Sequence, residues 1–174
     1  MELHRTDFLP NTGGQLVVVT YSASAVFEGD IKDLIVKFKY EHNKSLASLL
    51  ARSMMNSLGN IGDCDMVTWI PTVLERKNER GFDHAELLAR RVGVIVKKPS
   101  RRVLRRTSSG HQTGRSRAER RVGVSFVASP AVRGRQILLI DDVITTGTTM
   151  REAAQALVRS GASTVACLGV AYVL

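Results

Sequence analysis

One stretch restricts the fold of this chain more than any other: residues 137–150, with the sequence ILLIDDVITTGTTM. Its four leading apolar residues, 137–140, are typical of a strand buried on both faces of a parallel sheet. Two carboxylates follow, and then a loop of threonine and glycine. An amphipathic helix comes next. The capping-box spacing of Thr149 and Glu152 predicts that this helix begins at Thr149, and Gly161 predicts its end. A strand, a loop and a helix in this order indicate an α/β fold.

The chemistry of the loop follows from the helix that it precedes. A helix amino terminus leaves backbone N–H groups unpaired and carries a partial positive charge, so it attracts phosphate. Threonine hydroxyls add donors, and Gly147 allows close approach of the backbone. Asp141 and Asp142 cannot bind phosphate but suit hydroxyls or a metal-bound ligand, so the pair and the loop together predict a sugar-phosphate site. Neither a Walker A loop nor a G-x-G-x-x-G turn occurs in the chain.

Charge is distributed unevenly along the 174 residues. The net charge is +9, but residues 76–135 hold 17 of the 25 Lys and Arg and only four acids, which makes that segment +13 and the remainder −4. Such asymmetry indicates a polyanionic partner, for which pyrophosphate and nucleic acid both qualify. A merely solvated basic face is the alternative interpretation.

Length and composition favour a single domain, residues 1–174, with residues 1–14 as a loose lead-in. No apolar run approaches the roughly 18 residues of a membrane span, and no signal peptide is recognisable, so we expect a cytoplasmic protein. Cys64 and Cys167 form neither a disulfide framework nor a zinc spacing, and we expect both thiols to be buried. The four histidines show no ligand spacing.

Periodicity predicts the remaining elements of a mainly parallel sheet with helices on both faces. The expected strands are 16–21, 66–70, 94–96, 103–104, 122–126 and a final apolar segment, 163–174, that closes the sheet. The expected helices run from Asp30, over 45–58 with Leu46, Leu49, Leu50 and Met54 inward, and over 83–92. Residues 105–115 lack apolar periodicity and are predicted to form a mobile flap over the site.

The stretch that follows the central strand resembles the 5-phosphoribosyl-1-pyrophosphate (PRPP) signature of type I phosphoribosyltransferases. This resemblance implies a type I phosphoribosyltransferase-like fold and PRPP bound together with Mg²⁺. It also implies that Asp141 and Asp142 hold the ribose hydroxyls as the catalytic acids. The residues that would surround the 5′-phosphate are Val143, Ile144, Thr145, Thr146, Gly147, Thr148 and Thr149.

Two further segments narrow the resemblance to the ComF family of competence proteins. Residues 80–89, RGFDHAELLA, are similar to the family pattern R-G-F-N-Q-A-x-x-L-A, and residues 112–121 are similar to its Q-x-G-L-S-x-x-x-R stretch. Asp83-His84 replaces the usual Asn-Gln, and Arg115 stands where Leu is common. The zinc module of many members is missing, so no zinc is expected. The resemblance implies pyrophosphate contacts from Arg76, Lys77, Arg80 and Gly81, and flap contacts from Thr113, Gly114, Arg115 and Arg120.

Three functions remain open at this point. The first is transfer of a phosphoribosyl group to an unidentified nitrogen acceptor. The second is binding of PRPP or a nucleotide without turnover, and the third is association with single-stranded DNA through the basic segment, in which aromatic residues for base stacking are scarce. A homodimer is a common default for such domains.

Overall fold

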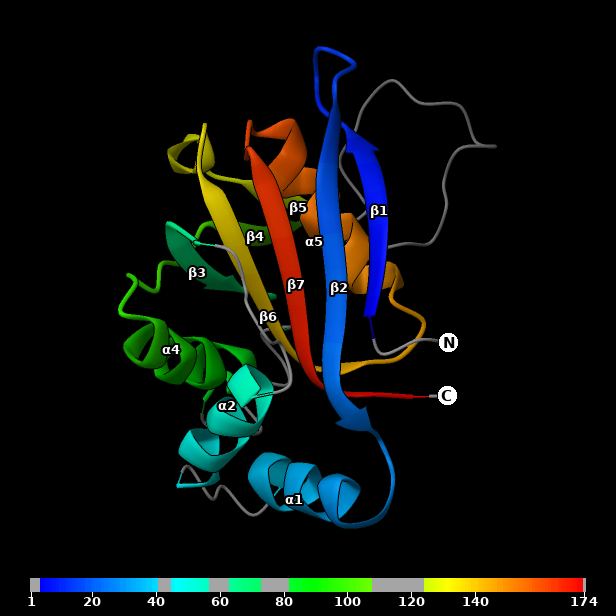
Figure 1. Ribbon diagram of the computed structural model, residues 1–174, viewed down its shortest axis with the longest axis vertical. Coiled ribbons are helices and arrows are strands. Elements are labelled where there is room, and N and C mark those ends of the chain that lie inside the picture. The colour runs from blue at the N-terminus through cyan, green and yellow to red at the C-terminus, as the bar shows by residue number, and fades with distance from the viewer. Residues whose placement is uncertain (1–3, 41–44, 57–62, 73–81, 108–123, 174) are drawn as a thin grey trace.

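The computed structural model describes residues 4–40, 45–56, 63–72, 82–107 and 124–173. A five-stranded sheet in the order β1-β2-β7-β6-β3 forms the centre of the molecule (Figure 1). Its strands are β1 (His4–Pro10), β2 (Leu16–Val26), β3 (Met66–Trp69), β6 (Gln136–Ile144) and β7 (Thr164–Tyr172). Strands β2, β7, β6 and β3 run parallel, and β1 pairs antiparallel with β2. The α/β fold with a mainly parallel sheet is therefore confirmed.

Residues 4–10 correct the prediction of a loose lead-in. They form the edge strand β1, paired with β2 from His4 opposite Ser22 to Pro10 opposite Leu16. The turn signals in this region belong to a hairpin: Asn11 Oδ1 accepts hydrogen bonds from the backbone N–H groups of Gly13 and Gln15. The Asx turn satisfies the backbone while the chain reverses.

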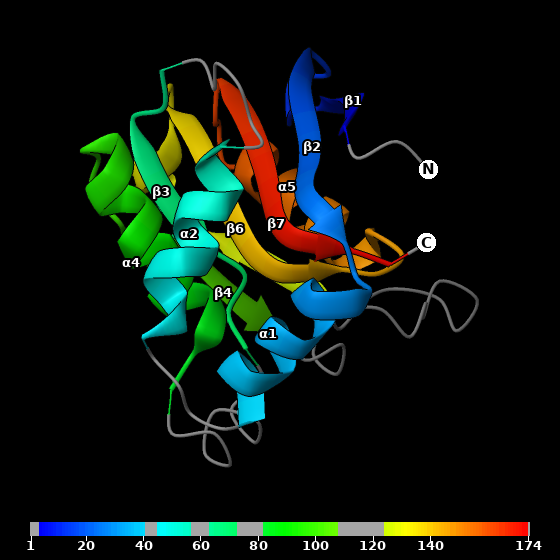
Figure 2. The same cartoon turned by 60° about the horizontal axis from the view of Figure 1, so that its bottom comes forward.

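Different elements cover the two faces of the sheet (Figure 2). Helices α1 (Gly29–Tyr40), α2 (Leu46–Asn56) and α4 (His84–Val96) share one hydrophobic cluster. Helix α5 (Thr148–Arg159) and the two-stranded sheet of β4 (Leu104–Thr107) and β5 (Ser125–Ala128) pack in the other cluster, which also contains the short 3-10 helix η2 (Pro130–Val132). Helices on both faces of a parallel sheet leave the carboxyl edge of the strands for function.

The central strand is the predicted one. Residues 137–140 of β6 are almost fully buried, at 0 to 1% exposure, because β3 and β7 flank the strand and both clusters cover it. We expected the final strand, β7, to close the sheet at its edge. This prediction is wrong, because β7 lies in the middle of the sheet between β2 and β6. Cys64 and Cys167 are buried thiols, as predicted.

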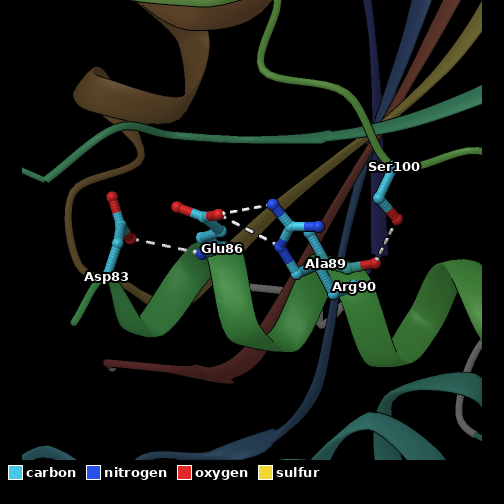
Figure 3. Close-up of polar contacts among 5 residues, drawn as sticks. All are labelled: Asp83, Glu86, Ala89, Arg90 and Ser100. Atoms are coloured by element: carbon cyan, nitrogen blue, oxygen red, sulfur yellow. Dashed lines mark hydrogen bonds and ion pairs between the residues drawn. The ribbon is translucent and has the colours of Figure 1, made fainter.

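Helix α4 corrects a second prediction, because residues 94–96 continue the helix instead of forming a strand. The N-cap of the helix is Asp83, whose carboxylate accepts a hydrogen bond from the Glu86 backbone N–H (Figure 3). Arg90 pairs with Glu86 on the exposed side, and the Ser100 hydroxyl donates to the Ala89 carbonyl, which fastens the returning chain to the helix (Figure 3). The helix ends where Lys97 adopts a left-handed conformation with φ of 56°.

Two smaller expectations also fail. Leu49 of α2, predicted to point inward, is 53% exposed, and Ala47 and Ala51 are buried with Leu50 and Met54 instead. Residues 105–107 of the predicted flap belong to strand β4, and the flap residues beyond 107 lie outside the described part of the chain.

Candidate functional site

The carboxyl end of β6 opens into a cavity of about 390 Å³, which we call the acid cavity. Asp141 and Asp142 line it together with the start of α5, the end of β3 and Lys39 of α1. Of the residues predicted to hold the 5′-phosphate, Val143, Ile144, Thr145, Gly147 and Thr149 line this same cavity. The structure thus brings most of the predicted sugar-phosphate residues to one place.

The two carboxylates are adjacent in a strand, where successive side chains point to opposite faces. Asp141 Oδ1 accepts a hydrogen bond of 2.9 Å from the Asp142 backbone N–H. Asp142 Oδ2 lies 2.9 Å from Nζ of Lys39, and both side chains of this ion pair are less than one fifth exposed. A cation therefore already stands at Asp142, where the predicted ligand hydroxyls or metal would approach.

Burial strongly raises the pKa of Asp141 above its ordinary value of 3.8, and the neighbouring charge of Asp142 raises it further. The backbone hydrogen bond from Asp142 and the charge of Lys39 both lower the pKa of Asp141, but they do not reverse the shift. Adjacent carboxyl groups with so little compensation are costly for folding, and such perturbed groups gather at functional sites.

The loop between β6 and α5 corrects the predicted capping box. The helix begins at Thr148 instead of Thr149, and its N-cap is Gly147 with φ of 74°, which makes no side-chain cap hydrogen bond. The Thr146 hydroxyl accepts a hydrogen bond of 3.4 Å from the Thr148 backbone N–H and donates to the Thr148 hydroxyl. A left-handed backbone conformation favours glycine, which explains Gly147 at this position. This turn places the amino terminus of α5, with its backbone N–H groups, at the cavity.

Gly169 of β7 shapes the floor of the site, and sequence reasoning missed it. It is opposite Asp141 in the β6–β7 register. A Cβ atom at Gly169 would lie 2.8 Å from Cγ1 of Ile144, so only the absence of a side chain leaves room for Ile144 at the base of the loop. The Ile144 carbonyl accepts from the Val173 N–H, which fixes the loop from the other side.

Asp83 connects the acid cavity to the segment that was predicted to bind pyrophosphate. Besides capping α4, its carboxylate accepts hydrogen bonds from the backbone N–H and the hydroxyl of Thr72, both at 3.1 Å. Thr72 lines the acid cavity, and residues 72 and 82 border the segment 73–81. Asp83 therefore holds the two borders of that segment near each other and near the cavity.

Arg106 of β4 is a second residue that the sequence did not single out for the site. Its guanidinium lies 5.7 Å from the centre of the Phe126 ring, and the residue lines the acid cavity. A guanidinium is a planar, permanently charged group whose fork of N–H donors matches the oxygens of an anion such as phosphate. The cavity thus contains an arginine opposite in charge to the acid pair.

Other predicted site residues are not in the acid cavity. Thr146 and Thr148 line a neighbouring cavity on the other side of the same loop. The predicted pyrophosphate residues Arg76, Lys77, Arg80 and Gly81 and the predicted flap residues Thr113, Gly114, Arg115 and Arg120 lie outside the described residues.

Sequence comparison identifies the family to which a chain with this fold belongs. The profile of the phosphoribosyl transferase domain family matches residues 78–173, and the chain belongs to that family. Among solved structures, the glutamine PRPP amidotransferase from B. subtilis, complexed with ADP and GMP, superimposes with a TM-score of 0.50 at 23% identity. That match covers 73% of this chain and 25% of the amidotransferase chain, and it supports the fold.

Two relatives are similar to about three quarters of this chain. The chain is similar to the DNA utilization protein YhgH of Salmonella typhi, at 28% identity over 142 residues, which are 76% of this chain and 63% of YhgH. It is also similar to the competence protein ComFC of Bacillus subtilis strain 168, at 27% identity over 135 residues, which are 75% of this chain and 55% of ComFC. The chain thus spans less than two thirds of the length of these relatives.

Two negative findings apply to the described residues. None of their helices is both long and apolar enough to cross a membrane. Nor do they contain a group of three or more His, Cys, Asp or Glu side chains arranged to hold a metal ion.

Proposed function

We propose that this protein binds PRPP together with Mg²⁺ in the acid cavity and transfers its phosphoribosyl group to a nitrogen acceptor. One observation carries the proposal: the acid pair, the amino terminus of α5 and Arg106 line a single cavity. PRPP carries a ribose diol, a 5′-phosphate and a pyrophosphate. The diol needs hydrogen-bond acceptors, the 5′-phosphate needs donors and the pyrophosphate needs a cation, and this cavity combines all three.

The chain's own residues would divide the work by charge. Asp141 and Asp142 would accept hydrogen bonds from the ribose hydroxyls. The backbone N–H groups at the start of α5 would hold the 5′-phosphate, helped by the helix dipole. Arg106 would attract the pyrophosphate, because a guanidinium matches phosphate oxygens with paired N–H donors.

Transfer breaks the bond between ribose C1 and the pyrophosphate oxygen, whose electron pair leaves with pyrophosphate, and forms a bond from C1 to the acceptor nitrogen. Positive charge develops on the ribose while negative charge grows on the leaving group. The acid pair would stabilise the former and Arg106 the latter, and fixed charges of this kind are each worth roughly 3–4 kcal/mol of barrier. We assign no general base.

Magnesium fits this donor set. Mg²⁺ is usually held by one or two carboxylates together with substrate phosphates and water, and it does not need a cage made only of protein groups. Asp141 and Asp142, which both line the acid cavity, would supply the carboxylates. When bound, Mg²⁺ would neutralise charge on the pyrophosphate.

Calorimetric titration of PRPP with Mg²⁺ into the wild type, Asp141→Asn and Asp142→Asn tests the proposal. The asparagine side chain keeps the shape and, at 141, an oxygen for the Asp142 N–H, but it cannot ionise. We expect each variant to weaken binding at least ten-fold, since a hydrogen bond to a charged group is worth roughly 1.5–3 kcal/mol. Asp33→Asn on the exposed side of α1 is the matched control. Wild-type protein that does not bind PRPP would overturn the proposal.

Binding without turnover is the result to expect if the protein is a PRPP or nucleotide sensor. Tight binding with no pyrophosphate release across a panel of nitrogen acceptors would favour that function.

The relative YhgH is named as a DNA utilization protein, which favours a second candidate: association with DNA, in the single-stranded form that we considered for the basic segment. Arg101, Arg102 and Arg105 are exposed at the start of β4 and could contact phosphates. Such binding would weaken steeply with salt. Charge reversal at these three arginines should abolish it and leave PRPP binding unchanged, whereas Asp141→Asn should do the opposite.

A further inference from the structure

A second cavity, of about 550 Å³, lies between the β1–β2 hairpin and α5. We call it the hairpin cavity. Its walls are Arg5, Tyr21 and Ala23 on the strands and the exposed side of α5. Among the described residues, the two cavities share only Ile144 and Gly147, so they lie on opposite sides of one loop.

Helix α5 presents a stripe of polar side chains to this cavity. Arg151, Gln155 and Arg159 follow at intervals of four residues, which places them on one face of the helix. Arg151 and Arg159 are eight residues apart and therefore separated by roughly 12 Å along the helix. The amino terminus of α5, with the hydroxyls of Thr146 and Thr148, lies at the Arg151 end of the stripe and also lines the cavity.

Asp7 positions two of the three arginines. Its Oδ2 lies 3.1 Å from Nη2 of Arg5 and 3.8 Å from Nη2 of Arg151, so one carboxylate holds a guanidinium from β1 beside a guanidinium from α5. Each guanidinium has five N–H donors, and Asp7 contacts only one nitrogen of each, which leaves donors for an anionic ligand. Such a ligand would find the arginines already oriented.

The remaining lining suits an aromatic ring. Tyr21 and Tyr172 line the cavity, and the Arg5 guanidinium lies 5.6 Å from the centre of the Tyr21 ring. Within the described part of the chain, the buried Tyr21 hydroxyl has no hydrogen-bond partner. Burial also raises the pKa of Tyr21, so its phenol keeps its proton and remains a donor. Gln155 and Glu152 add an amide and a carboxylate that can pair with the edge of a base.

We propose that the hairpin cavity is a binding site for a nucleotide, separate from the acid cavity. The phosphate would bind between Arg5, Arg151 and the hydroxyls of Thr146 and Thr148, which do not line the acid cavity, and the base would lie farther along the stripe. A volume of this size falls within the range of small-molecule sites. Because Ile144 and Gly147 belong to both cavities, a nucleotide here would change PRPP affinity, and PRPP would change nucleotide affinity by the same factor.

The competing explanation is that the arginines only fasten the hairpin to α5. Asp7 does bridge the two elements, and the Gln155 side chain donates to the Pro10 carbonyl at 2.9 Å. Fastening alone predicts that loss of Arg159, which lies two turns beyond the Asp7 bridge, has no effect on any ligand.

The test is calorimetric titration of AMP, GMP and inorganic phosphate, without Mg²⁺, into the full chain. The variants are Arg151→Gln/Arg159→Gln, Arg159→Glu and Asp141→Asn. Arg91→Gln is the control, because Arg91 is an exposed arginine on α4, on the other face of the sheet. Thermal unfolding of each variant establishes that it folds.

We expect at least one nucleotide to bind the wild type, Asp141→Asn and Arg91→Gln alike, at least ten-fold more tightly than inorganic phosphate. The double arginine variant and Arg159→Glu should each weaken that binding at least ten-fold. Absence of nucleotide binding, unchanged binding in the arginine variants, or equal affinities for nucleotide and phosphate would each overturn the proposal. PRPP binding in the same arginine variants reports separately on the acid cavity.

Discussion

Replacing Lys39 with methionine tests the electrostatic account of the acid cavity. The ammonium of Lys39 lies 2.9 Å from Asp142 Oδ2, and the two side chains are 19% and 17% exposed. Methionine keeps most of the apolar stem and removes the charge. The substitution therefore leaves two neighbouring carboxyl groups without their closest cation.

The size of the effect follows from the distance and the burial. At 2.9 Å and an effective dielectric constant of about 20, two unit charges attract by about 6 kcal/mol, and desolvation offsets most of this. Breaking a fully buried pair costs roughly 3–5 kcal/mol, whereas exposed pairs contribute roughly 0–1 kcal/mol. For a pair about one fifth exposed we expect Lys39→Met to lower the free energy of unfolding by about 1–3 kcal/mol at neutral pH.

Urea denaturation measures this loss, with Lys37→Met, an exposed lysine of the same helix, as the control. Because Lys39 lowers the pKa of Asp141, carboxyl carbon NMR should also show a higher pKa for Asp141 in the variant. The reasoning would be refuted by a loss no larger than the ±0.5 kcal/mol of an ordinary surface substitution. An unchanged pKa of Asp141 would refute it equally.

Three further predictions concern the site. Burial and the charge of Asp142 raise the folded-state pKa of Asp141, so the stability of the wild type falls as the pH rises through that pKa. Asp141→Asn should remove this fall, and in mildly alkaline buffer the variant should melt at a higher temperature than the wild type. Gly169→Val should lower the free energy of unfolding by roughly 1–3 kcal/mol in denaturation, because its side chain overlaps Ile144, and a wild-type midpoint would argue against the tight contact. In calorimetry, Arg106→Gln should weaken PRPP at least ten-fold but leave ribose 5-phosphate unchanged, and equal losses would contradict a pyrophosphate role.

The centre of the fold was predictable because its signal is local. The apolar run 137–140, the two acids and the threonine-glycine loop are contiguous in sequence, and the buried strand, the cavity and the left-handed Gly147 lie there. The capping box failed because the N-cap of the helix is Gly147, two residues before Thr149. The helical residues 94–96 were mistaken for a strand because β-branched residues favour strands, although Val94 is 75% exposed on a helix that packs through other positions.

Residues brought together by tertiary structure could not be predicted. Lys39 is more than a hundred residues from Asp142, and nothing in its helix indicates an ion pair with β6. Arg106 was hidden within a basic segment, and Gly169 is a glycine in an otherwise ordinary strand. Pairing of β1 with β2 likewise depends on the sheet, since residues 4–10 alternate only weakly in burial.

The most direct test of the central claim is a nitrogen-proton NMR titration of the labelled protein with PRPP and Mg²⁺. A ligand in the acid cavity should shift the backbone amide signals of Asp142, Thr145, Gly147 and Thr149 first and most. Asp142→Asn should require at least ten-fold more PRPP for the same shifts, in line with the roughly 1.5–3 kcal/mol of a charged hydrogen bond. Shifts confined to other surfaces, or none at saturating PRPP, would contradict a sugar-phosphate site at the end of β6.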